Sequence, residues 1–207
     1  MLLGAAGSAP RAAVPQPETE HPAAGRFLVA TEQVRGPFFQ HSVVLLLSYA
    51  GDGSIGLIIN RRTDFALHDI VKGAVDGAGA LYLGGPVARG SVLVLLRSGS
   101  PPGHAIRIAG DLFVTVDPAI LLDRTGSPDA ANDLRVYTGY AGWGAGQLDA
   151  EIARGDWIVA NEGVEAVFDG APDELWKKLH LRHHRLLTRG GSALPKMAGF
   201  TRPTRSN

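Results

Sequence analysis

The feature that most constrains the fold is a glycine-spaced segment at 134–157, LRVYTGYAGWGAGQLDAEIARGDW. An apolar stretch runs into four glycines, at 139, 142, 144 and 146, and a short helical pattern follows. Glycine at this density indicates backbone with positive φ, or backbone in very close contact with another group. The segment therefore predicts a strand, then a glycine loop, then a short helix that ends before Trp157.

The glycine loop allows two interpretations. A strand, a glycine loop and a helix can bind an anion, because backbone N–H groups at a helix N-terminus attract negative charge. The spacing is G-x-G-x-G, however, and no G-K-[ST] follows, so neither common phosphate-binding fingerprint is present. We favour an architectural role, in which the glycines let Trp143 pack beneath the loop while Tyr137 and Tyr140 brace the strand. The alternative is a ligand or small-anion site, with the candidate residues Trp143, Gly144, Gly146, Gln147 and Glu151.

Composition favours one compact domain. The chain has 207 residues, of which 45% are hydrophobic and 19% charged, and it contains no cysteine. The lack of cysteine excludes disulfides, thiolate metal sites and a cysteine nucleophile. The apolar run at 43–47 is far shorter than the ~20 residues that a membrane span requires, and no basic residue precedes the apolar N-terminal residues. We expect a cytoplasmic protein with no membrane contact.

Charge is unevenly distributed, although the formal net charge is zero. No acidic residue follows Glu174, so the chain beyond it carries +8 and the chain up to it carries −8. A basic end can bind nucleic acid, here through Arg182, Arg185 and Arg189, but no aromatic residues alternate with the charges as stacking platforms. The other interpretations are a solubilising end and a tail that lies on the acidic body of the same protein.

The pattern of short apolar runs and turns predicts an α+β fold. Residues 1–24 are rich in Ala and Pro and are expected to be disordered, 25–180 form a single domain, and 181–207 form a basic, mostly disordered tail. Hairpin turns between short strands favour α+β over a regular βαβ array. Strands are expected at 27–30, 42–48, 54–60, 81–83, 91–96, 106–109, 112–116 and 134–140, and helices at 66–75, after Asp117-Pro118, after Gly146 and from Pro172.

Other polar groups give weaker indications of chemistry. His180, His183 and His184 have the spacing of helical metal ligands, but a third fixed ligand is missing and the surroundings are cationic. No serine lies in G-x-S-x-G. Residues 60–62, Asn-Arg-Arg, could hold an anion, although a solvated turn is the favoured interpretation. We therefore assign no catalytic residue, no metal site and no cofactor, and an enzymatic activity is not favoured.

The glycine-spaced segment, together with GRFLVATEQVRGPFFQHSVVLLL, GSIGLIIN and LYLGGPV, resembles the YqgE/AlgH family over about residues 25–179. The resemblance implies a mixed, strongly bent sheet that forms a partly closed barrel with short helices packed outside. Family members often have histidine where Tyr49 stands and proline where Arg62 stands. If that histidine has a chemical role elsewhere in the family, this chain lacks the proton carrier.

Three functions remain open from the sequence. The favoured one is a non-enzymatic regulatory or interaction module with an unidentified protein partner. One branch of the family carries a transcriptional-regulator label, although no helix-turn-helix pattern is present in this chain. The alternatives are a small-molecule or anion-binding protein, or an enzyme, that uses the loop at 142–146, and nonspecific nucleic-acid association through the basic tail.

Overall fold

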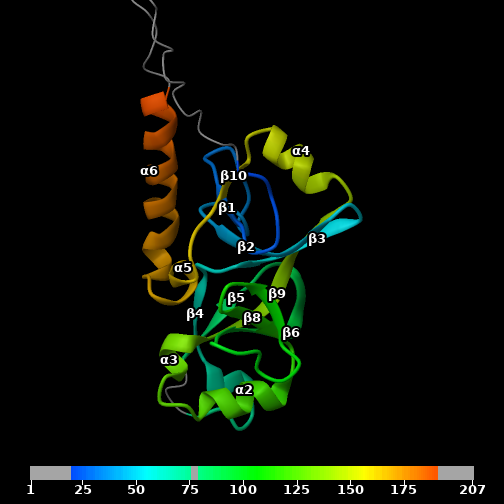
Figure 1. The fold of residues 1–207 in the computed structure, drawn as a ribbon, viewed down its shortest axis with the longest axis vertical. Helices are drawn as coiled ribbons and strands as arrows, with labels where there is room; N and C mark the ends of the chain where they lie inside the picture. Colours follow the sequence, from blue (N-terminus) through cyan, green and yellow to red (C-terminus); the bar gives the residue numbers. More distant parts are fainter. Residues whose placement is uncertain (1–19, 76–78, 191–207) are drawn as a thin grey trace, which may run out of the picture.

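The computed structural model describes residues 20–75 and 79–190, with only the backbone of 184–190. Residues 1–19 of the expected arm and 191–207 of the expected tail lie outside the described residues. The described chain forms a strongly curled mixed sheet with helices outside it (Figure 1). None of the helices in these ranges is long and apolar enough to cross a membrane. The expected α+β class and the partly closed barrel are confirmed.

The strands and helices have the following bounds. The strands are β1 (Phe27–Ala30), β2 (Val43–Ala50), β3 (Gly53–Ile58), β4 (Arg62–Ala66), β5 (Ala80–Leu83), β6 (Val87–Arg97), β7 (Ile106–Ala109), β8 (Leu112–Thr115), β9 (Leu134–Gly144) and β10 (Trp157–Ala160). The helices are α1 (Leu67–Ile70), α2 (Pro118–Thr125), α3 (Ala130–Asp133), α4 (Gln147–Ala153), α5 (Glu165–Phe168) and α6 (Pro172–Gly190).

The sheet is built around the long strand β9. The strand order is β10-β1-β2-β3-β9-β6-β8-β7, with antiparallel pairing throughout this path. Strand β5 pairs with β9 in parallel, and β4 pairs with β5. In Figure 1, β1, β2, β3 and β10 lie in one half of the molecule and β5, β6 and β8 in the other, so β9 connects the two halves.

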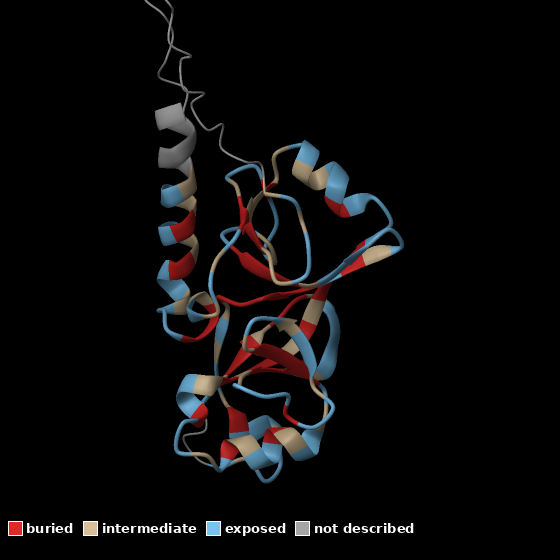
Figure 2. Ribbon diagram, viewed as in Figure 1, coloured by how far each residue is buried: buried red, intermediate tan, exposed pale blue. Residues whose placement is uncertain are grey.

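The central strands are buried on both faces. In β1, Phe27 and Val29 belong to one apolar cluster, whereas Leu28 and Ala30 belong to a second cluster on the opposite face. This division follows from the strand period of two, which points successive side chains to opposite faces. A third cluster joins Phe113 and its neighbours to α2 and α3. Figure 2 shows these buried strands inside a shell of exposed helix faces and loops.

Helix α6 packs against the face of β1 that carries Phe27 and Val29. Leu175 and Leu179 are buried in the first cluster, and the Trp176 Nε1 donates to the Ala30 carbonyl at 2.7 Å. The helix continues to Gly190, beyond the expected start of the tail at 181. The sequence explains this length, because neither glycine nor proline occurs between Asp173 and Arg189.

The prediction of a helix at 66–75 is wrong over most of that range. Only Leu67–Ile70 is helical; Val71 already has extended φ and ψ, and Gly73 has φ of +88°. Val71 and Ala74 nevertheless pack against the third cluster. The apolar spacing that indicated a helix therefore comes from an irregular segment that turns its apolar residues toward the same core.

Candidate functional site

The expected glycine loop is largely strand. Strand β9 continues to Gly144 and pairs with β3, with Gly142 opposite Ile55 and Gly144 opposite Gly53. Only residues 145 and 146 remain as the turn before α4. Local glycine content favours a loop, but strand preference depends on the neighbours available, and here β3 supplies a continuous partner. The prediction of a loop after the strand at 134–140 is wrong for residues 141–144 and holds only for residues 145 and 146.

The close backbone contact expected of these glycines is present. Gly139 has φ of +67°, and a Cβ added to it would lie 2.6 Å from the Gly85 carbonyl oxygen. A Cβ added to Gly84 would lie 2.4 Å from the Gly139 carbonyl oxygen. The glycines of LYLGGPV and of TGYAGWG therefore fit against each other where the two segments cross. This crossing accounts for Gly84 and Gly139 without a ligand, whereas a Cβ on Gly142 or Gly144 would make only ordinary contacts of 3.4 Å or more.

Trp143 is buried next to this crossing. Trp143 is 6% exposed, and its ring packs edge-on against the Trp157 ring with 6.1 Å between centroids. The Phe39 ring lies within 6.3 Å of both indoles. Leu148 of α4 belongs to the same apolar cluster. The indole thus forms part of the core between the sheet and α4.

Glu151 links both indoles through one carboxylate. Trp143 Nε1 and Trp157 Nε1 both donate to Glu151 Oε2, at 2.8 and 2.9 Å, and Gln147 Nε2 donates to Glu151 Oε1 at 2.9 Å. The Gly144 N–H in turn donates to Gln147 Oε1 at 3.1 Å. We call Trp143, Gln147, Glu151 and Trp157 the Glu151 hub. The hub contains three of the five candidate ligand-binding residues, and a fourth, Gly144, donates to it, but their polar groups bind one another.

Gly146, the fifth candidate, has a different role. It precedes α4 with φ of +69°, and no atom lies within 4 Å of the position its Cβ would occupy. Its left-handed conformation turns the chain from β9 into α4.

Asp149 of α4 accepts a hydrogen bond of 2.6 Å from the Tyr49 hydroxyl, which ties the β2–β3 hairpin to the helix. This bond raises the pKa of Tyr49 above its ordinary value, because the neutral phenol is the donor.

His180 and His183 of α6 face separate acids. His180 Nε2 lies 4.0 Å from Glu32 Oε1, and its ring stacks on Trp176 with 4.7 Å between centroids. His183 Nε2 lies 3.8 Å from Glu162, and burial lowers the pKa of His183. Within 20–75 and 79–183, whose side chains are described, no group of three His, Asp or Glu residues could hold a metal ion.

Arg182, near the start of the basic end of the chain, forms an ion pair with Glu162 of the same chain. Arg182 Nη1 donates to both carboxylate oxygens of Glu162, at 2.8 and 2.7 Å. This contact corresponds to the interpretation in which the tail lies on the acidic body of the protein. The side chains of Arg185 and Arg189, the other candidate nucleic-acid contacts, lie outside the described residues, as does that of His184.

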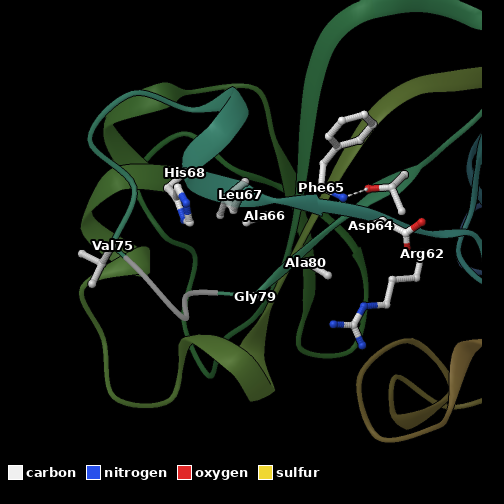
Figure 3. Close-up of a pocket in the computed structure, with 10 residues that line it drawn as sticks. Arg62, Asp64, Phe65, Ala66, Leu67, His68, Val75, Gly79 and Ala80 are labelled. Carbon is white, nitrogen blue, oxygen red and sulfur yellow. Dashed lines mark hydrogen bonds between the residues drawn. The ribbon is translucent and has the colours of Figure 1, made fainter.

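A pocket that the sequence did not indicate lies beside β4 (Figure 3). Its volume is ≈ 360 Å³, and its lining residues are Arg62, Thr63, Asp64, Phe65, Ala66, Leu67, His68, Val75, Gly79 and Ala80. Phe65 is 60% exposed and Val75 is 51% exposed. Two large apolar side chains therefore remain in contact with water at the rim of one pocket. We call the strand β4 with this rim the β4 edge.

The sequence reasoning missed the β4 edge because it treated residues 60–62 as a solvated turn. Asn60 is buried instead: its Oδ1 accepts from the Val43 N–H at 2.8 Å, and its Nδ2 donates to the His41 carbonyl at 3.0 Å. These bonds carry the chain out of the hairpin and into a further strand. The alternation of polar and β-forming residues in Arg62–Ala66 was the available signal.

Comparison with known proteins agrees with this architecture. Residues 27–185 match the family model described as AlgH-like. A UPF0301 protein of Streptomyces avermitilis is 37% identical over 78% of this chain and 86% of its own length. A UPF0301 protein of Methylococcus capsulatus is 34% identical over 81% of this chain and 94% of its own length.

Solved structures show the same fold. The solution structure of the AlgH protein from Pseudomonas aeruginosa aligns with a TM-score of 0.64 and 26% identity, over 85% of this chain and 96% of that one. The crystal structure of a Corynebacterium diphtheriae protein aligns with a TM-score of 0.65 and 27% identity, over 80% of this chain and 89% of that one. With a family model that spans most of its length, this chain belongs to the AlgH-like family.

Proposed function

We propose that this protein is a non-enzymatic interaction module that binds a protein partner at the β4 edge. The observation that carries the proposal is the exposure of Phe65 and Val75 at the rim of one pocket. An apolar rim gains free energy when a partner removes it from water, by about 25 cal/mol per Å² of apolar surface. A regulatory role, which the family resemblance suggests, would act through such a partner.

The Glu151 hub supports the same proposal because it is a poor alternative binding site. Its carboxylate, its amide and both indole N–H groups already have partners within the hub. A ligand that used these groups would first have to break hydrogen bonds to a charged acceptor, which typically contribute about 1.5–3 kcal/mol each. The β4 edge requires no such rearrangement before it binds.

Affinity capture with matched surface variants tests the proposal. The tagged full-length chain, the Phe65→Ser variant and the Ile106→Ser variant are used as baits in a lysate of the source organism. Ile106, at 67% exposed, lies on β7 and controls for the loss of an exposed apolar side chain. We expect a stoichiometric partner with the wild type and with Ile106→Ser, and its loss with Phe65→Ser. Equal recovery with both variants, or no partner with the wild type, contradicts the proposal.

A further inference from the structure

The outer side of β4 presents unpaired backbone groups. Among the described residues, β4 pairs only with β5. The Leu83 N–H donates to the Arg61 carbonyl at 2.8 Å, which makes Arg62 and Tyr82 a non-hydrogen-bonded antiparallel pair. The N–H and C=O of Arg62 therefore point away from β5. An edge of this kind is a template for another strand.

The register of β4 becomes irregular after Arg62. The register pairs of β4 are Arg62 with Tyr82 and Ala66 with Ala80, so Thr63, Asp64 and Phe65 lie in the irregular stretch between them. We place the backbone groups of Asp64 on the same side as those of Arg62, because Thr63 between them faces β5, where its hydroxyl donates to the Leu81 carbonyl at 2.8 Å. Phe65 N–H, by contrast, contacts the Thr63 hydroxyl at 3.4 Å. The free edge is thus centred on Thr63.

The side chains on this edge carry opposite charges. Arg62 and Asp64 are both exposed, and neither side chain forms a hydrogen bond or ion pair with the residues that the structure describes. The two residues are two positions apart, so they lie on the same face of the strand. Figure 3 shows both side chains at the same end of the pocket. A strand with the reverse order of charges would complement them.

A second copy of β4 has that order when it runs antiparallel. If Thr63 of one copy lies opposite Thr63 of the other, Arg62 of each copy lies opposite Asp64 of its partner. The outward backbone groups of Arg62 and Asp64 then form the hydrogen-bonded pairs that this register needs. Opposite charges directly across a strand pair stabilise it, whereas like charges destabilise it. We infer that the partner at the β4 edge is a second copy of this chain, which forms an antiparallel β4–β4 dimer.

The dimer has a closed two-fold geometry. The same patch is used on both copies, so the interface cannot extend into a filament. The same register places Phe65 of each copy, 60% exposed in the single chain, opposite Arg61 of the other. The short strand and the apolar rim define a small interface, which predicts reversible, concentration-dependent association rather than a permanent dimer. This inference rests on the proposed function, because it names the partner at the same site.

A charge exchange tests the register directly. In Arg62→Asp, two aspartates face each other across the two-fold axis, and in Asp64→Arg two arginines do. We expect sedimentation velocity to show wild-type dimers that increase with concentration, and each variant alone to be monomeric. A mixture of the two variants restores opposite charges at both positions, so we expect dimers again, as with the double exchange Arg62→Asp/Asp64→Arg.

Matched variants separate this effect from general attraction between oppositely charged proteins. Arg35→Asp and Asp52→Arg change exposed residues outside β4 by the same charges. We expect each of them to dimerise like the wild type. Monomeric wild type over the whole concentration series, or dimers of either β4 variant alone, overturns the inference. If the inference fails while capture of another protein still depends on Phe65, the proposed function stands; if that capture fails as well, both are wrong.

Discussion

The Glu151 hub and the β4 edge contain similar kinds of side chain and use them in opposite ways. Each combines aromatic residues with charged groups. In the hub, Trp143 and Trp157 are 6% and 5% exposed, and their N–H groups end on one carboxylate. At the edge, Phe65 is 60% exposed, and Arg62 and Asp64 face outward. The proposed function depends on this difference: the polar groups of the hub already have internal partners, and the side chains of Arg62 and Asp64 have none among the described residues.

The two regions also differ in how the backbone is held. On β9, the strand that carries Trp143 of the hub, Gly139 is in direct backbone contact with a second chain segment, and the strand is paired on both sides. In β4, the stretch between Arg62 and Ala66 leaves the regular register. Bulges of this kind are common at sheet edges and next to functional sites. Substitutions should therefore reduce stability strongly in the first region and association in the second.

The largest effect is expected at the glycine crossing. Gly139→Ala forces a left-handed residue to carry a Cβ and places that Cβ 2.6 Å from the Gly85 carbonyl oxygen. Backbone strain and overpacking together should lower the free energy of unfolding by roughly 3 kcal/mol or more. Urea denaturation followed by tryptophan fluorescence measures the change.

Gly146→Ala is the matched control for this substitution. Gly146 has nearly the same φ, +69°, but no atom lies within 4 Å of its Cβ position. Its cost should be limited to the left-handed conformation, about 1 kcal/mol. Equal destabilisation by the two variants would show that the backbone contact at Gly139 contributes nothing.

The next largest effect is expected at the centre of the hub. Glu151→Ala leaves the N–H groups of two nearly buried indoles without their acceptor. The cost of unsatisfied buried donors predicts a loss of about 3 kcal/mol in the free energy of unfolding. Gln147→Ala removes an exposed member of the same hub and should cost less than about 1 kcal/mol. Denaturation curves of both variants check the order, and a larger loss for Gln147→Ala contradicts it.

The β4 edge should behave differently in the same assay. Arg62→Asp and Phe65→Ser change exposed side chains, so the free energy of unfolding of the monomer should stay within about 0.5 kcal/mol of the wild type. The measurement is made at the lowest usable protein concentration, because association adds stability by mass action. A large loss in either variant would mean that the edge is part of the core architecture, like the hub.

These two regions also show what the sequence could predict. The β2–β3 hairpin and the β7–β8 hairpin were predicted correctly, because their turns carry local glycine and aspartate signals. A helix was expected after Asp117-Pro118, and α2 begins there, with the Asp117 side chain accepting from the Ala119 N–H as its N-cap. Local chemistry determines these features, and a single sequence displays it.

The missed features depend on contacts between distant segments. Gly142 and Gly144 belong to a strand because β3 lies beside them, and Glu151 meets Trp157 because α4 folds back on the sheet. The β4 edge likewise depends on Asn60 binding the backbone at His41 and Val43. Residue types and spacing alone cannot reveal which partner a polar side chain finds. The structure places Trp143, Gly144, Gln147 and Glu151 close together, but the hydrogen bonds among them could not be foreseen from the sequence.

The smallest effect is expected where the hub region meets the β2–β3 hairpin, and it depends on pH. The Tyr49 hydroxyl donates to Asp149, and this bond raises the pKa of Tyr49 from its ordinary value of 10.0. A pKa that is higher in the folded state adds stability while the phenol is protonated in both states, and that stability is lost as pH rises through the folded-state pKa. The difference in stability between wild type and Tyr49→Phe should thus be constant from neutral pH to pH 10.0 and should disappear at higher pH. Thermal melting across this range measures it, with the other tyrosines common to both proteins. A difference that persists unchanged at high pH would show that the contact with Asp149 is made by the ring and not by the hydroxyl.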